Sequence, residues 1–186
     1  LDFFMGLAGG IMLAVVVFDL MKESMNEMGI PYTIIFTFIG VLLTMLLKKK
    51  LDVSKDMKTG YLIFISILLH NLPEGLAIGS SFISAETLGI TLAIIIGIHN
   101  IPEGLAMALS LVGSKMKISK VILFTIIAGI PMGIGSFLGA YFGSVFHSLI
   151  GVFLALAAGT MMYVVLEEIF PKSRSLYCII GFLVGT

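Results

Sequence analysis

The stretch GYLIFISILLHNLPEGLAIGSSFI, residues 60–83, decides the fold class of this chain. It is apolar over a length that can cross a bilayer, for which a helix needs about 20 mostly apolar residues. Near its middle stand a histidine, an asparagine and a glutamate, at His70, Asn71 and Glu74. An ionisable group at the centre of a bilayer costs at least about 2.5–3.5 kcal/mol on insertion scales, so it usually marks a function. The stretch therefore predicts a membrane-spanning helix that carries a site at mid-depth.

The rest of the chain has the same character, since 59% of its 186 residues are hydrophobic and only 12% are charged. Soluble domains are nearer a quarter charged. Six stretches have roughly the length of a spanning helix, and a seventh begins near the C-terminus. They are about Phe3–Met21, Tyr32–Leu47, Gly60–Ile83, Leu88–Val112, Ser119–Phe142 and Ser148–Phe170, then from Leu176 onward. None alternates polar and apolar residues as a barrel strand would. We expect an all-α polytopic helix bundle in the lipid bilayer of the cell membrane.

The charged residues and the single cysteine exclude several classes of protein. The formal net charge is zero, which argues against a nucleic-acid partner. Cys178 is the one cysteine, so an intramolecular disulfide and a cysteine-rich metal site are excluded. Ten of the eleven basic residues fall in the connections at 48–58, 115–120 and 172–174. Because basic loops stay on the cytoplasmic side, the connection at about 48–59 is predicted to be cytoplasmic.

Two internal repeats organise the chain. His70–Ala77 (HNLPEGLA) and His99–Ala106 (HNIPEGLA) are identical at seven of eight positions, and Gly10–Asp19 aligns more faintly with Gly159–Glu168. The spans in each pair cross in opposite directions, which is the inverted repeat common in transporters, with the binding site at the repeat interface. The seventh span would pair with a span before residue 1. We therefore interpret residues 1–186 as a single transmembrane domain of an eight-helix protein, truncated at both ends.

The octapeptides predict a metal site. His70 and Glu74 are four residues apart and share one helix face, and His99 and Glu103 repeat that arrangement. Both histidines lie roughly 15 Å into their spans. The proline of each motif should kink its helix and free carbonyl oxygens toward a cavity. Imidazole and carboxylate ligands suit zinc, iron(II), manganese or cadmium. The predicted metal ligands are His70, Asn71, Glu74, His99, Asn100 and Glu103. A purely structural hydrogen-bond clamp between the two helices is the alternative.

Residues 70–75 (HNLPEG) and 99–104 (HNIPEG) resemble the fourth- and fifth-helix signatures of the ZIP (Zrt/Irt-like) family, nearest its bacterial zinc-uptake members. Residues 157–168 resemble the seventh helix of that family, and residues 6–12 resemble the second. The resemblance implies an eight-helix 3+2+3 bundle that moves divalent metals toward the cytoplasm as substrates, not cofactors. It implies a principal site of His70, Glu74 and Glu103 supported by His99. Asn71 and Asn100 would serve a second site that shares the glutamates.

One departure from the family concerns Ile130, which stands where many relatives carry a glutamate before a proline, here Pro131. The second site should then be weaker or absent. A glycine series at 129, 133, 135, 139 and 143 favours packing inside the bundle over a homodimer interface, and both remain open. Asp19, Glu167 and Glu168 are either entry and exit ligands or charged helix ends that reach the headgroups.

A transporter that is not an enzyme is the main hypothesis. An intramembrane metalloenzyme is the first alternative, although His99–Glu103 lacks the His-Glu-x-x-His pattern of zinc proteases. A proton or monovalent-ion pathway is the second.

Overall fold

The computed structural model describes residues 2–185, apart from the side chains of Lys55, Asp56, Ser84, His99 and residues 143–148. Helices make up nearly all of this part of the chain, and it contains no strand. The elements in chain order are α1 (Asp2–Val15), the π-helical turn η1 (Val16–Leu20), α2 (Met21–Met28), α3 (Ile30–Lys50), α4 (Lys55–Ser84), α5 (Glu86–Gly113), α6 (Ile118–Val164), the π-helical turn η2 (Val165–Ile169), the 3₁₀ turn η3 (Phe170–Lys172) and α7 (Ser175–Val184).

Six helical segments among the described residues are long and apolar enough to cross a membrane. They are Asp2–Met28, Ile30–Lys50, Met57–Ile83, Glu86–Gly113, Ile118–Phe142 and Leu149–Lys172, with the shorter apolar helix Ser175–Val184 after them. The predicted all-α polytopic bundle is confirmed. The element labelled α6 contains two of these segments. They are separated at Phe142, where the backbone leaves helical geometry (φ −128°, ψ 20°).

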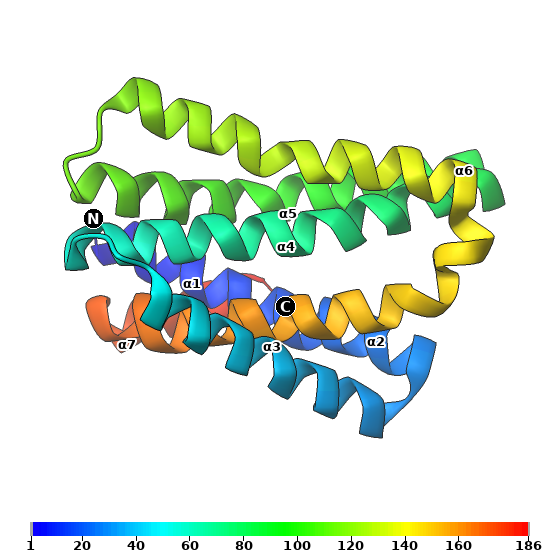
Figure 1. The fold of residues 1–186 in the computed structure, drawn as a ribbon, viewed down its shortest axis with the longest axis horizontal. Coiled ribbons are helices and arrows are strands. Elements are labelled where there is room, and N and C mark those ends of the chain that lie inside the picture. Colours follow the sequence, from blue (N-terminus) through cyan, green and yellow to red (C-terminus); the bar gives the residue numbers. More distant parts are fainter. Residues whose placement is uncertain (1, 186) are drawn as a thin grey trace.

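The bundle has two distinct ends (Figure 1). The α3–α4 and α5–α6 connections, which carry most of the basic residues, lie at one end. The bend of α6 near Phe142 lies at the other. We call these the basic end and the opposite end. A tight reversal between α2 and α3 uses Gly29, whose φ of +83° is open to glycine at little cost.

Glycines bring three pairs of helices into backbone contact. A Cβ on Gly139 of α6 would lie 2.3 Å from the carbonyl oxygen of Leu76 in α4. Gly159 faces Thr37 of α3 in the same way, and Gly181 of α7 faces Leu7 of α1. Gly133 of α6, in contrast, has nothing within 4 Å of its Cβ position. Part of the α6 glycine series therefore packs inside the bundle, as expected.

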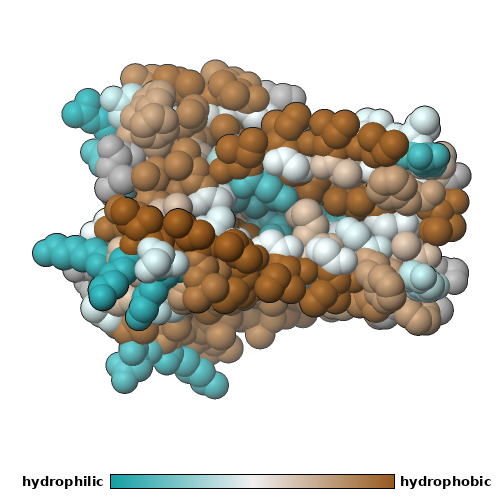
Figure 2. Space-filling model, turned by 90° about the horizontal axis from the view of Figure 1, so that it is seen from above, coloured by the Kyte–Doolittle hydropathy of each residue, from teal (hydrophilic) through white to brown (hydrophobic). Residues whose placement is uncertain are grey.

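The surface fits a lipid environment. Hydrophobic residues form long ridges on the face seen in Figure 2, and hydrophilic residues gather mainly at the ends. Between two ridges a hollow exposes a hydrophilic patch near the middle of that face. A polar opening within an apolar band is what a membrane protein with a mid-depth site requires.

The faint repeat has a structural counterpart. When Gly10–Asp19 is aligned with Gly159–Glu168, the turn η1 (Val16–Leu20) falls on η2 (Val165–Ile169), residue for residue. Asp19 and Glu168 then occupy the same place in their turns. Single π-helical turns within α-helices are rare and often mark functional positions. The match supports the alignment on grounds other than residue identity.

Candidate metal centre

His70 and Glu103 form a buried pair between α4 and α5. The Nε2 atom of His70 lies 2.7 Å from Oε2 of Glu103, and both side chains are at most 1% exposed. The Nδ1 atom of His70 lies 3.0 Å from the carbonyl oxygen of Ser66, which can only accept, so Nδ1 donates. One proton therefore lies between Nε2 and Oε2. A backbone carbonyl that fixes the far nitrogen in this way is the usual support of a metal-binding histidine.

A small cavity of about 180 Å³ adjoins this pair, between α4, α5 and α6. Asn71, Asn100 and Glu103 line it. Each asparagine holds its amide nitrogen on α6: Asn71 Nδ2 donates to the carbonyl of Ala128 at 2.7 Å, and Asn100 Nδ2 contacts the sulfur of Met132 at 3.8 Å.

One side-chain oxygen of each of these three cavity residues lacks a hydrogen-bond partner. Within the described part of the chain, Asn71 Oδ1, Asn100 Oδ1 and Glu103 Oε1 are buried and have no hydrogen-bond partner. An unsatisfied buried acceptor costs about 1–3 kcal/mol. Three such oxygens at one cavity can therefore serve as ligands of a cation.

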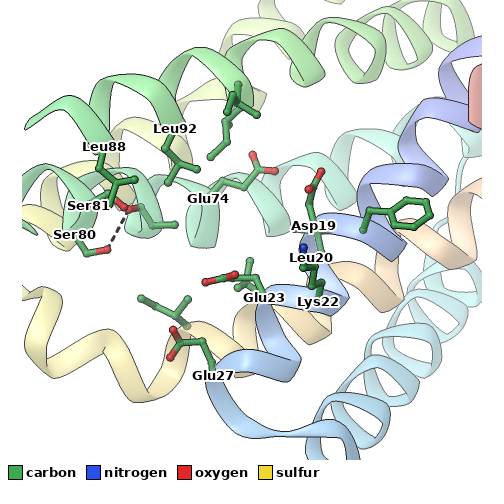
Figure 3. Close-up of a pocket in the computed structure, with 16 residues that line it drawn as sticks. Asp19, Leu20, Lys22, Glu23, Glu27, Glu74, Ser80, Ser81, Leu88 and Leu92 are labelled. Carbon is green, nitrogen blue, oxygen red and sulfur yellow. Dashed lines mark hydrogen bonds between the residues drawn. The ribbon is translucent and has the colours of Figure 1, made fainter. Parts of the chain in front are cut away.

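Glu74 lies on the wall of a different cavity. This larger space of about 510 Å³ is bounded by the α1–α2 region, α4, α5 and the second half of α6. Glu74 points into it from α4, with Asp19 on the η1 wall and Glu23 and Glu27 farther along α2 (Figure 3). Because Ser81 and Leu88 also line it, the cavity extends from mid-bundle toward the opposite end.

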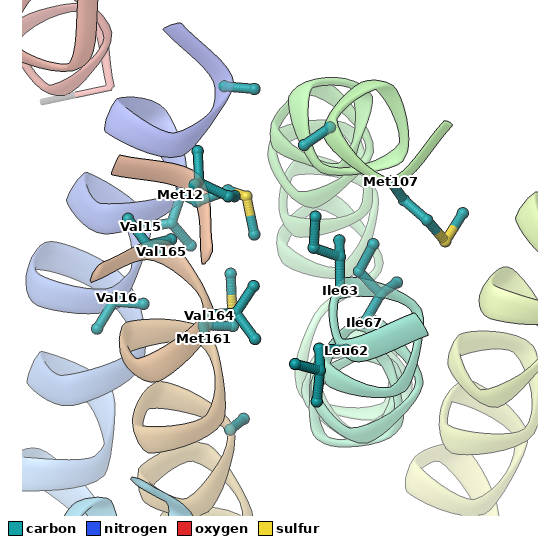
Figure 4. Close-up of a cluster of buried hydrophobic side chains, with 14 of the residues drawn as sticks. Met12, Val15, Val16, Leu62, Ile63, Ile67, Met107, Met161, Val164 and Val165 are labelled. Atoms are coloured by element: carbon teal, nitrogen blue, oxygen red, sulfur yellow. The ribbon is translucent and has the colours of Figure 1, made fainter. Parts of the chain in front are cut away.

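The basic end beyond the pair is closed by packed apolar side chains. Leu62, Ile63 and Ile67 precede His70 on α4, and Met107 follows Glu103 on α5; all are buried. Leu62 and Ile63 face Met12, Val16, Met161 and Val164 from α1, η1 and α6, whereas Met107 points away from that group (Figure 4).

A charged network closes the basic end further. Glu168 of η2 is 5% exposed and pairs with Lys48 of α3 at 2.7 Å. It also accepts a hydrogen bond from Thr59 of α4 at 2.6 Å and contacts Lys172 at 3.3 Å. Glu168 is thus a buried cross-link, and the alternative of a solvated helix end is wrong for this residue. The sequence did not reveal Thr59, which is 109 positions away.

The six predicted ligands are thus divided in space. His70 pairs with Glu103; Asn71, Asn100 and Glu103 share the small cavity; Glu74 lines the larger one. The side chain of His99 lies outside the described residues. Among the residues that are described, no three His, Cys, Asp or Glu side chains converge as a metal site requires. The full ligand set remains a prediction.

A family model described as ZIP zinc transporter matches residues 47–186, three quarters of the chain and both octapeptides. The chain belongs to the ZIP family. It is therefore a multi-pass membrane transporter and not an enzyme, which excludes the intramembrane metalloenzyme.

Several curated proteins are similar to this ZIP chain. Zinc transporter ZupT of Chlorobium chlorochromatii (strain CaD3) is 31% identical over 201 residues, covering 91% of this chain and 75% of that protein. Zinc transporter GufA of Myxococcus xanthus is 38% identical over 114 residues, covering 61% of this chain and 45% of GufA. Zinc transporter ZIPB of Bordetella bronchiseptica is 36% identical over 115 residues, covering 61% of this chain and 37% of ZIPB.

Proposed function

We propose that this ZIP chain carries divalent metal ions, zinc foremost, into the cytoplasm through the His70–Glu103 pair. One observation carries the proposal: an imidazole nitrogen and a carboxylate oxygen, 2.7 Å apart and fully buried, stand beside three acceptor oxygens without partners. A structural clamp would satisfy those oxygens. The relatives described as zinc transporters support the choice of zinc.

The chemistry follows from the shared proton. Zinc needs a neutral imidazole and an ionised carboxylate, so binding displaces the proton between Nε2 and Oε2. The bond from Nδ1 to the Ser66 carbonyl keeps the ring oriented while this happens. Asn71 and Asn100 supply amide oxygens from the small cavity that Glu103 also lines. Nitrogen and oxygen donors of this kind also accept iron(II), manganese or cadmium.

The two cavities suggest the direction of movement. The larger cavity is lined by the carboxylates of Asp19, Glu23 and Glu27, with Lys22 among them, and by Glu74. Glu74 is one helical turn from His70 on α4, so it can pass a cation to the pair. The basic end is closed by the apolar cluster and the Glu168 network, and the charge bias assigns that end to the cytoplasm. Metal would enter at the opposite end and leave once the basic end opens.

The shared proton also favours a second candidate, a proton pathway that needs no metal. His70 and Glu103 already hold a proton at mid-membrane, as a relay would. Proton flux that persists in strong chelator would favour this candidate over metal transport.

The proposal is tested by uptake of radioactive zinc into liposomes that contain the full-length protein. Wild type is compared with His70→Ala and Glu103→Gln. Glu86→Gln is the matched control, because Glu86 is an exposed residue of the first turn of α5. We expect saturable uptake by wild type and control, and a loss of at least about tenfold in both site variants. Equal uptake by all four inserted proteins would overturn the site.

A further inference from the structure

We infer that Met132 determines metal selectivity: its thioether gives the small cavity a soft donor that favours cadmium and zinc over manganese. The inference rests on the proposed function, because it assigns the cavity to the transported cation. It concerns a residue of α6, the helix that also carries Ile130.

Position 130 does not lie on the face of α6 that lines the small cavity. The α6 lining residues are Thr125, Ala128, Gly129 and Met132, which follow helical spacing. The side chain of Ile130 is 51% exposed and lies off this face. Thr125 donates its hydroxyl to the carbonyl of Val121 at 3.0 Å. Met132 is therefore the α6 side chain of this lining whose donor atom reaches a predicted ligand.

Met132 is also tied to that ligand directly. The Nδ2 group of Asn100 contacts the Met132 sulfur at 3.8 Å, which turns Oδ1 of Asn100 away from α6 and leaves it unpaired. The Ala128 carbonyl orients Asn71 in the same sense. Helix α6 thus orients both asparagine side chains. The Met132 sulfur holds the amide of Asn100, and the Ala128 carbonyl holds the amide of Asn71.

The resulting donors are mixed in character. Glu103 Oε1 and two amide oxygens are hard ligands, which suit manganese and magnesium as well as zinc. A thioether is soft and discriminates in favour of cadmium and zinc. Met107, which is buried on the α5 wall, is a second thioether at the same cavity.

The test uses Met132→Leu, which keeps side-chain volume and removes the donor, and Met132→Gln, which replaces sulfur by an amide. Met162→Leu is the matched control, because Met162 is also on α6 but lines neither cavity. Equilibrium dialysis of the full-length protein against Cd²⁺ and against Mn²⁺ gives the ratio of the two dissociation constants. Competition of each ion with zinc uptake gives the same ratio during transport.

We expect Met132→Leu to reduce the preference for cadmium over manganese by about tenfold, the lower range for a supporting contact at a metal site. Met132→Gln should reduce it further, and Met162→Leu should leave it at the wild-type value. An unchanged ratio in both Met132 variants, or an equal change in Met162→Leu, overturns the inference while zinc uptake stands. Wild type that neither binds nor transports metal overturns the proposed function itself and the inference with it.

Discussion

The two ring nitrogens of His70 have separate roles. Nδ1 is committed to the Ser66 carbonyl, so ring orientation does not depend on what Nε2 binds. Nε2 is 2.7 Å from Glu103 and shares a proton with it. A metal ion and a proton therefore compete for the same two atoms. Apparent zinc affinity should fall as the pH falls, because protons refill the position that zinc needs.

Proton release measures this competition directly. Adding zinc to wild-type protein in weakly buffered detergent solution should release about one proton per ion from the pair. Glu103→Gln should release none from it, because a glutamine amide donates to the neutral ring and no shared proton remains. Glu86→Gln should behave as wild type. Zinc binding without proton release in wild type would contradict the shared proton.

The lengths of the helices follow from the sequence, but their mutual rotation does not. The apolar run at Gly60–Ile83 predicted α4 (Lys55–Ser84) closely, since apolar length sets a span. The first span was predicted to end at Met21 but continues through α2 to Met28, because that polar segment consists of good helix formers. The prolines of the two motifs were predicted to kink their helices, but α4 and α5 continue as helices through Pro73 and Pro102.

The sequence singled out the members of the candidate site but not their arrangement, and metal binding by these residues stays a prediction. Repetition of HNLPEG and HNIPEG was enough to select His70 and Glu103. Whether Glu74 joins them or lines another cavity depends on how α4 is rotated against α1, which no local pattern encodes. Met132 had no distinguishing signal, because methionine in an apolar helix is ordinarily filling.

Glycines on α6 provide a matched test of helix packing. Gly139→Ala places a Cβ 2.3 Å from the Leu76 carbonyl oxygen, so α4 and α6 must move apart. We expect a loss of about 1–3 kcal/mol, seen as a lower thermal unfolding midpoint in detergent. Gly133→Ala meets nothing within 4 Å and should keep or raise the midpoint, since alanine favours helix by about 1 kcal/mol over glycine. Equal midpoints for the two variants would refute the close contact.

At the scale of the whole molecule, the two ends of the structure differ. The larger cavity extends toward the opposite end, while Glu168, Lys48 and Thr59 tie η2, α3 and α4 together at the basic end. Such asymmetry is what one state of an alternating-access transporter presents.

Labelling of an introduced cysteine tests this asymmetry in cells. Cys178 is buried, so wild type should give little background. Ser81→Cys, on the wall of the larger cavity, should react with a membrane-impermeant maleimide in intact cells. Ser66→Cys, at 1% exposed and on the closed side of His70, should be protected there. Reaction of Ser81→Cys in inverted vesicles alone would reverse the proposed orientation.

The paired turns η1 and η2 bear on how this chain arose. A π-helical turn amounts to one residue inserted into an α-helix, which costs stability wherever it gives no advantage. Here the insertion stands at the same position of the aligned segments, with Asp19 inside one turn and Glu168 inside the other. A single insertion before gene duplication explains this more simply than two later events at one site. If the two halves arose by duplication, their common ancestor carried the extra residue and the acidic residue within the same turn.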